Sequence, residues 1–371
     1  MTWMPRSHAA RKVAEPGARL LPPPQANAEK GCSRPGLANL PAIREIPEIP
    51  EIKDEPEWNL LCPECGAGAF VAGAYLHCPA EGRRFPTLDG VLPLLTGDRR
   101  RELVPFLAAY RVVRRAEGWS GDAQYYLDLP FRDRSGRHRS IWKLRARSFR
   151  VALTEVKRVF GTLPLQVLDL GAGNCWLAAR LARLGHRVLA VDVQLDDRDG
   201  LLAFNRYHLG LAEASGRVHR AQADLERLAL GAQQFDLVVA NGSFHYAADP
   251  FRAASEACRV LRPDGLLLVL DSPTYSSADF GAAMVDDRQR DHRDRYGLSL
   301  GPRLQSGFLV YSNFVGLLER LGFAVRVVRC FAGWSREIRG LLARTTRRRP
   351  PAEFPVFVAR KAAPGDKAVG R

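Results

Sequence analysis

The sequence predicts an α/β fold built on a doubly wound, largely parallel sheet, and three observations predict it. A short apolar run, Val167–Leu170, ends in a glycine turn. Two later strand-like segments, 186–192 and 218–224, each end in an aspartate. The uninterrupted apolar run Leu266–Leu270, which follows the turn residues 263–265, is typical of a parallel strand that helices cover on both faces.

The glycine turn after Val167–Leu170 is the most informative stretch of the chain. It contains Gly171 and Gly173 and leads into a helix expected over 176–184. Glycine lets the backbone turn tightly and approach a ligand with no Cβ in the way. A helix that begins at such a turn directs its free N–H groups at whatever lies there. The stretch therefore predicts a nucleotide-type ligand site at the end of a strand.

The spacing of these glycines separates two kinds of ligand. The dinucleotide fingerprint G-x-G-x-x-G requires a third glycine where this chain has Trp176, whose bulk argues against close packing of a pyrophosphate on the helix. The pattern D-x-G-x-G-x-G is matched by Asp169, Gly171 and Gly173, with the small Cys175 at the last glycine position. On these residues the sequence resembles the class I S-adenosylmethionine-dependent methyltransferases, most closely their broad type 11 group.

Further elements follow in the order found in that family. Asp192 ends its strand where an acid can accept hydrogen bonds from a ribose diol. The resemblance places Asp224 at the adenine amino group and the Leu225 backbone beside the ring. Taken alone, each acid also fits an ordinary solvated residue. The resemblance implies S-adenosylmethionine as cofactor and these cofactor-binding residues: Asp169, Gly171, Ala172, Gly173, Asp192, Asp224, Leu225 and Asn241.

The resemblance covers roughly residues 165–360 and implies a Rossmann-like, doubly wound sheet of seven strands with an antiparallel last strand. We expect a helix over 310–321, a strand over 323–331 and the last strand over 354–360. The predicted methyltransferase domain is residues 161–361.

A separate small module is predicted over residues 58–97. Cys62-Pro-Glu-Cys65-Gly has the form of a zinc knuckle, in which two thiolates bind one metal ion. The second knuckle, Cys78-Pro-Ala-Glu81-Gly, has glutamate in place of the last cysteine, so the module resembles a degenerate zinc ribbon. Three thiolates with Glu81 or His77 form one possible zinc site; the alternative is a module that has lost the metal and is held by packing.

The remaining segments frame these two domains. A Pro-rich arm without packed structure is expected at the N-terminus and a frayed tail at the C-terminus. We expect a helical cap between the module and the first strand, with a loop inside it. A charged insertion after the apolar run is either a lid over the pocket or a solvated helix. In chain order these are the arm 1–57, the cap 98–160 with its loop 121–135, the insertion 279–296 and the tail 362–371.

Composition limits the class of protein. The 371 residues carry a net charge of +15, which is compatible with RNA binding, although the arginines are dispersed and a solvated surface is the simpler interpretation. Seven cysteines, an odd count, predict a reducing, cytoplasmic setting and not a disulfide framework. The chain has no apolar run of membrane-spanning length, and its first 20 residues do not resemble a secretory signal.

The segment 241–246, Asn-Gly-Ser-Phe-His-Tyr, is expected to face the transferred methyl group by the resemblance. It lacks the Pro-Pro-aromatic pattern of enzymes that methylate DNA bases or glutamine amides. His245 is the candidate catalytic base, or else only shapes the pocket. We therefore expect in-line methyl transfer to a small molecule, with an RNA base methyltransferase or a non-catalytic cofactor-binding scaffold as alternatives. The sequence does not specify the oligomeric state.

Overall fold

The computed structural model describes residues 58–298, 307–330 and 350–362. The predicted N-terminal arm and all but the first residue of the predicted tail lie outside these ranges. Among the described residues, no helix is long and apolar enough to cross a membrane.

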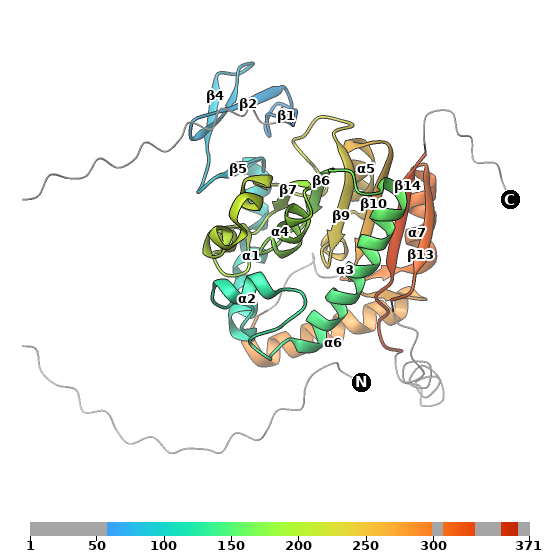
Figure 1. Ribbon diagram of the computed structural model, residues 1–371. Helices are drawn as coiled ribbons and strands as arrows, with labels where there is room; N and C mark the ends of the chain where they lie inside the picture. The colour runs from blue at the N-terminus through green and yellow to red at the C-terminus, as the bar shows by residue number, and fades with distance from the viewer. Residues whose placement is uncertain (1–57, 299–306, 331–349, 363–371) are drawn as a thin grey trace, which may run out of the picture. The chain divides into compact units, whose positions relative to one another are not determined.

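The main sheet has eight strands in the order β13-β14-β10-β9-β6-β7-β8-β5 (Figure 1). Its central strands are parallel, whereas β14 is antiparallel to both of its neighbours. The doubly wound sheet and its antiparallel last strand are therefore confirmed, with one strand more than the seven predicted. In chain order the strands are β5 (Val91–Pro93), β6 (Gln166–Leu170), β7 (Arg187–Asp192), β8 (Val218–Gln222), β9 (Phe235–Asn241), β10 (Leu261–Leu270), β13 (Phe323–Val328) and β14 (Val356–Lys361).

Helices cover both faces of this sheet. Successive strand residues point to opposite sides, so a buried strand packs its side chains against the helices on both faces. In β10, Leu266 and Leu268 pack into the cluster that includes α3 and α4, whereas Leu267 and Val269 pack into the cluster that includes α5 and α7. This arrangement explains the uninterrupted apolar run. The helices are α3 (Arg139–Phe160), α4 (Trp176–Arg183), α5 (Pro250–Val260) and α7 (Tyr311–Arg320).

The predicted helical cap forms three helices: α1 (Gly97–Glu117), α2 (Ala123–Asp128) and α3. The Thr96 side chain accepts a hydrogen bond from the Arg99 N–H and caps α1, which ends at the left-handed Gly118. The prediction of a loop over 121–135 was wrong in part, because Asp122 caps α2 and the two tyrosines of that helix are buried. The predicted insertion is a helix, α6 (Ala278–Tyr296). The short strand β11 (Thr274–Tyr275) precedes it in the chain and pairs in parallel with β12 (Leu309–Val310), which follows it. Short 3₁₀ segments lie at Leu201–Arg206, His208–Arg217 and Phe244–Tyr246.

The N-terminal module is a four-stranded antiparallel sheet that is joined to the main sheet. Its strands are β1 (Leu60–Leu61), β2 (Gly68–Ala72), β3 (Tyr75–Cys78) and β4 (Arg83–Pro86). The Trp58 ring stacks on Phe235 of β9, with ring centroids 6.1 Å apart. The chain then continues into β5, which pairs in parallel with β8 and supplies the eighth strand of the main sheet.

Candidate active site

A cavity opens at the carboxyl ends of β6, β7 and β9. The chain runs from β6 to β7 and β8 on one side and then returns to place β9 on the other side of β6. Ligands of doubly wound folds bind at such a switch point. The described residues that line the cavity are Phe106, Leu107, Tyr110, Arg114, Arg145, Gly171, Ala172, Gly173, Asn174, Trp176, Val191, Asp192, Val193, Gln194, Asp199, Ala223, Leu225, Asn241, Gly242, Ser243 and Tyr246.

The glycine turn forms the floor of this cavity. Gly171 has a φ of 75°, and its N–H donates to the Val191 carbonyl of the neighbouring strand at 2.8 Å. A Cβ at Gly171 would lie 2.2 Å from the Cβ of Ser243, so no larger residue fits there. The predicted residues Gly171, Ala172 and Gly173 all line the cavity, as the sequence requires for backbone that approaches a ligand.

Asp192 ends β7 and faces the cavity, where its carboxylate is held by the backbone. Its two oxygens accept hydrogen bonds from the Gly173 N–H at 2.8 Å and the Gln194 N–H at 2.7 Å. Burial raises the pKa of Asp192 to about 6, although these backbone donors act in the opposite direction. The side chain is therefore mostly ionised at neutral pH and presents a fixed acceptor to a ligand.

Asp169 lies beneath the turn and is not among the residues that line the cavity. Its side chain is buried, and within the described part of the chain neither carboxylate oxygen has a hydrogen-bond partner. Burial, reinforced by the charge of Asp192, raises the pKa of Asp169 to about 8. The structure thus brings Asp169 close to the cofactor-binding residues predicted from the sequence but places it behind them.

The side chains of Asp224 and Leu225 point to opposite sides of the segment that forms one wall of the cavity. Leu225 lines the cavity together with Ala223, whereas Asp224 is absent from the described lining. The buried Asp224 carboxylate forms an ion pair with Arg99 of α1 and accepts the Glu226 N–H at 3.1 Å. Side chains alternate along an extended chain, so a wall that presents Ala223 and Leu225 inward turns Asp224 outward.

Asn241, at the end of β9, occupies the opposite end of the cavity. Its Nδ2 donates to the Asp271 carboxylate at 2.8 Å, and the Ser148 hydroxyl donates to the same carboxylate oxygen at 3.0 Å. This fixes the amide, and the Asn241 Oδ1 has no hydrogen-bond partner among the described residues. Burial raises the pKa of Asp271.

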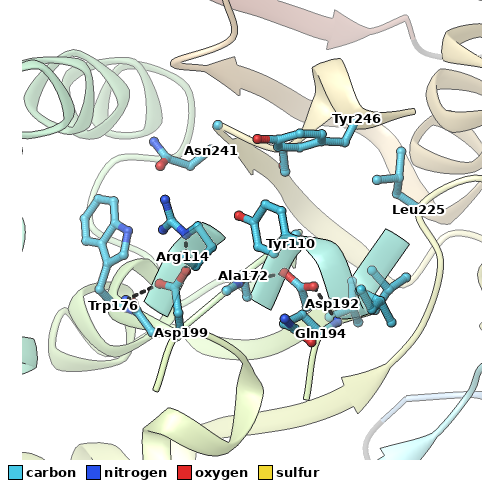
Figure 2. Close-up of a pocket in the computed structure, with 18 of the residues that line it drawn as sticks. Tyr110, Arg114, Ala172, Trp176, Asp192, Gln194, Asp199, Leu225, Asn241 and Tyr246 are labelled. Atoms are coloured by element: carbon cyan, nitrogen blue, oxygen red, sulfur yellow. Dashed lines mark hydrogen bonds and ion pairs between the residues drawn. The ribbon is translucent and has the colours of Figure 1, made fainter. Parts of the chain in front are cut away.

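His245, the predicted catalytic residue, is buried and is not among the described residues that line the cavity. Its Nδ1 lies 3.2 Å from the Ser272 hydroxyl. Burial, with smaller contributions from Arg288 and Arg145, lowers the pKa of His245 to about 3. The next residue, Tyr246, presents its ring to the cavity instead (Figure 2).

Comparison with known proteins agrees with this geometry. A family model described as a methyltransferase domain, Methyltransf_11, matches residues 168–269. Arsenite methyltransferase of Aquipseudomonas alcaligenes is 32% identical over 164 residues, 43% of this chain and 44% of that protein. Malonyl-[acyl-carrier protein] O-methyltransferase of Methylococcus capsulatus is 37% identical over 110 residues, 30% of this chain and 38% of that protein. Ubiquinone/menaquinone biosynthesis C-methyltransferase of Vibrio vulnificus is 34% identical over 110 residues, 29% of this chain and 40% of that protein.

The match lies on the strands and turns that build the cavity. The chain contains a class I S-adenosylmethionine-dependent methyltransferase domain. It spans less than half the length of each of these three relatives.

Sequence reasoning did not identify which residues of the cap line the methyltransferase cavity. Tyr110 and Arg114 reach it from α1 (Figure 2). Arg145 reaches it from α3. The Arg114 guanidinium forms an ion pair with Asp199 and lies 3.8 Å from the centroid of the Trp119 ring. The spacing of Tyr110 and Arg114, four residues apart on one helix face, was the available signal.

A second cluster lies outside the methyltransferase domain, in the N-terminal module. One ligand atom from each of Cys62, Cys65, Cys78 and Glu81 lies within 4.8 Å of every other. Thiolates bound to one tetrahedral zinc ion at about 2.3 Å lie about 3.8 Å apart, so these residues are close enough to share a metal. His77, the alternative ligand, instead stacks on Phe70 with ring centroids 5.3 Å apart.

Proposed function

We propose that this protein transfers a methyl group from S-adenosylmethionine to a small-molecule acceptor by in-line displacement. The observation that carries the proposal is the cavity at the switch point of the sheet, where the glycine turn and the fixed Asp192 carboxylate face one space. A dinucleotide site would require a helix that begins close to a pyrophosphate, and here the bulky Trp176 lines that position.

The residues present fit the parts of the cofactor in order. Leu225, Asp192, Ala172 and Asn241 succeed one another across the cavity (Figure 2). Leu225 and Ala223 offer an apolar surface to adenine, and Asp192 accepts the ribose hydroxyls. The turn lets the backbone approach the sulfur end. Asp169 and Asp224 act from behind, by supporting the turn and by tying the wall to α1.

Catalysis here needs positioning more than proton transfer. When bound, the cofactor supplies a methyl group on a sulfonium, which is already an activated leaving group. The rings of Phe106, Tyr110 and Tyr246 line the cavity and exclude water. Orientation of this kind is worth up to about 7–11 kcal/mol. His245, buried and with its pKa lowered to about 3, is a poor base at neutral pH.

The aromatic lining supports a small acceptor, as do the names of two relatives, which act on arsenite and in quinone biosynthesis. An RNA base is the second candidate, favoured by the net charge of +15. Several described arginines are paired with acids, such as Arg115 with Asp196 and Arg206 with Asp197, which reduces the positive charge available to a phosphate backbone.

The experiment that tests this function has two steps. Calorimetric titration with S-adenosylmethionine should give binding, and transfer of labelled methyl groups into fractionated cell extract should label the small-molecule fraction. Label in RNA that is lost at high salt would support the second candidate. Binding without label in any fraction would identify a non-catalytic cofactor-binding protein, and absence of binding would contradict the proposal.

We further propose that Cys62, Cys65, Cys78 and Glu81 hold one structural zinc ion. Four protein ligands leave no open position, as in structural zinc sites. The Glu81 carboxylate also pairs with Arg83 at 2.8 Å, which orients it. On this basis we retain residues 58–97 as a module that precedes the cap 98–160 and the domain 161–361. Metal analysis of the purified protein that finds no zinc would contradict this proposal.

A further inference from the structure

Two tyrosines face the methyltransferase cavity with hydroxyl groups that the protein itself does not use. Tyr110 lies on α1 and Tyr246 ends the 3₁₀ segment after β9, and both side chains are half-buried in the cavity lining. Their rings meet edge to face, with centroids 6.1 Å apart. Both hydroxyls project to the same side, toward Arg114 and Asn241 (Figure 2). Within the described part of the chain, neither hydroxyl has a hydrogen-bond partner.

Two fully buried tyrosines elsewhere in the chain provide a comparison. The Tyr126 hydroxyl donates to the Arg198 carbonyl at 2.6 Å, and the Tyr207 hydroxyl donates to the Asn174 carbonyl at 2.7 Å. A buried tyrosine O–H usually finds such a partner, because leaving it unpaired costs free energy. The two hydroxyls in the cavity instead face the space that a ligand enters, and their partner must come from outside the chain.

The chemistry of the pair indicates what kind of ligand atom it binds. Burial raises the pKa of Tyr110 far above its ordinary value, so this phenol remains protonated and cannot act as a base at neutral pH. A protonated tyrosine has one O–H to donate. Two such donors that face one space are satisfied together by one oxygen with two lone pairs, such as a carbonyl, enolate or phenolate oxygen.

The cavity lining offers no group that is free to remove a proton from the acceptor. Its two carboxylates are already engaged: Asp192 accepts two backbone N–H groups, and Asp199 pairs with Arg114. No histidine, lysine, glutamate or cysteine is among the described lining residues. An acceptor that reacts through an ionisable O–H must therefore reach the cavity already deprotonated, with its proton released to water.

We propose that the hydroxyls of Tyr110 and Tyr246 together bind an anionic oxygen of the methyl acceptor, and that the acceptor is an enol or a phenol that enters as its anion. The inference rests on the proposed function and names its acceptor class. Hydrogen bonds to an ionised oxygen are roughly twice as strong as those between neutral groups. The ring of Phe106, whose centroid lies 5.7 Å from that of Tyr110 and 6.4 Å from that of Tyr246, adds apolar surface for the rest of a planar acceptor.

The experiment titrates 4-nitrophenol, whose neutral and anionic forms absorb at different wavelengths, into protein saturated with S-adenosylhomocysteine. The absorbance should show that the anion binds, at least about tenfold more tightly than nitrobenzene, which lacks the phenolic oxygen. Tyr110→Phe and Tyr246→Phe keep the ring and remove only the hydroxyl. Each should weaken nitrophenolate binding by about tenfold and leave the affinities for nitrobenzene and S-adenosylhomocysteine unchanged. Tyr75→Phe, at an exposed tyrosine of the N-terminal module, is the matched control.

Three results would overturn the inference while S-adenosylhomocysteine still binds: no binding of nitrophenolate to the wild-type protein, binding of nitrophenol in its neutral form, or equal nitrophenolate affinity in the wild type and both phenylalanine variants. Phenyltrimethylammonium is a further probe, because aromatic rings also bind cations. Tighter binding of this cation than of nitrophenolate would assign the rings to a cationic ligand and overturn the inference as well. If the wild-type protein does not bind S-adenosylhomocysteine, the proposed function itself fails.

Discussion

The cavity of the methyltransferase domain and the cysteine module that precedes this domain in the chain are stabilised in different ways. The strands around the cavity are buried on both faces, so the hydrophobic core holds them. The module exposes large apolar side chains: Phe70 is 48% exposed and Tyr75 44%. A module of roughly 40 residues with so little core relies on a metal or on a neighbour. The comparison teaches that the cavity is preformed by packing within its own domain, whereas the module buries Leu60 and Leu76 in the core of the main sheet and depends on that neighbour.

Helix α1 links the two regions. Glu64, which lies between Cys62 and Cys65, accepts a hydrogen bond from the Gly97 N–H at the start of α1, at 2.7 Å. Two residues later Arg99 pairs with Asp224 behind the cavity wall. Changes at the cavity should therefore affect ligand binding strongly, and changes at the module should reach the same site only through α1.

The largest effect is expected for Asp192→Ala. Each charge-assisted hydrogen bond is worth about 1.5–3 kcal/mol, so loss of two bonds to ribose should reduce S-adenosylhomocysteine affinity by at least about 100-fold. Calorimetry measures the affinity, and Glu213→Ala, at an exposed acid, is the control. A loss smaller than about tenfold would contradict the role of Asp192 and weaken the distinction between the two regions.

A smaller effect on S-adenosylhomocysteine affinity is expected when the pH is lowered. Burial raises the pKa of Asp192 to about 6, and the ionised form is the one that accepts hydroxyl donors. Affinity for S-adenosylhomocysteine should therefore be constant above that pKa and fall about tenfold for each unit below it. Titrations between about pH 5 and 8 measure this dependence. Asp192→Asn, which does not titrate, should bind weakly and show no such pH dependence.

The cavity floor could be predicted from the sequence because it depends on local rules. The turn needs glycines at fixed spacing, and Asp192 follows directly from the end of its strand. The orientation of Asp224 could not be predicted, because Arg99, which holds its carboxylate, is 125 residues away in the chain. The cap residues share this limitation, since helical periodicity identifies a buried face without specifying what that face contacts.

A substitution in the cysteine module should have a weaker effect on S-adenosylhomocysteine binding in the cavity. Cys62→Ser should remove bound zinc and loosen the support that Glu64 gives to α1. Loss of this hydrogen bond at the first turn of α1 costs about 1 kcal/mol, so S-adenosylhomocysteine affinity should fall by at most about fivefold. Zinc content and calorimetry are measured together. Cys258→Ser, which changes a thiol of α5 outside the cluster, should change neither value.

If Cys62→Ser lost its zinc but bound S-adenosylhomocysteine as the parent does, the two regions would be energetically independent and α1 would only connect them. If the variant kept its zinc, Cys62 would not be a ligand. Glu64→Gln sharpens the result, because it leaves the cysteines in place and weakens only the acceptor at the Gly97 N–H.

The smallest effect on methyl transfer is expected for a change at His245. This residue stands between Ser243 and Tyr246, which line the cavity, but it is not itself among the described lining residues. Its ring is buried against Ser272, and a pKa lowered to about 3 leaves it neutral and weakly basic at pH 7. His245→Gln keeps a hydrogen-bonding side chain at this position and should change the methyl-transfer rate by less than about threefold, well below the usual contribution of a general base. A loss of about 100-fold without a change in S-adenosylhomocysteine affinity would return His245 to the mechanism. Such a result would mean that the cavity changes shape during the reaction, because only then does a group behind its wall reach the acceptor.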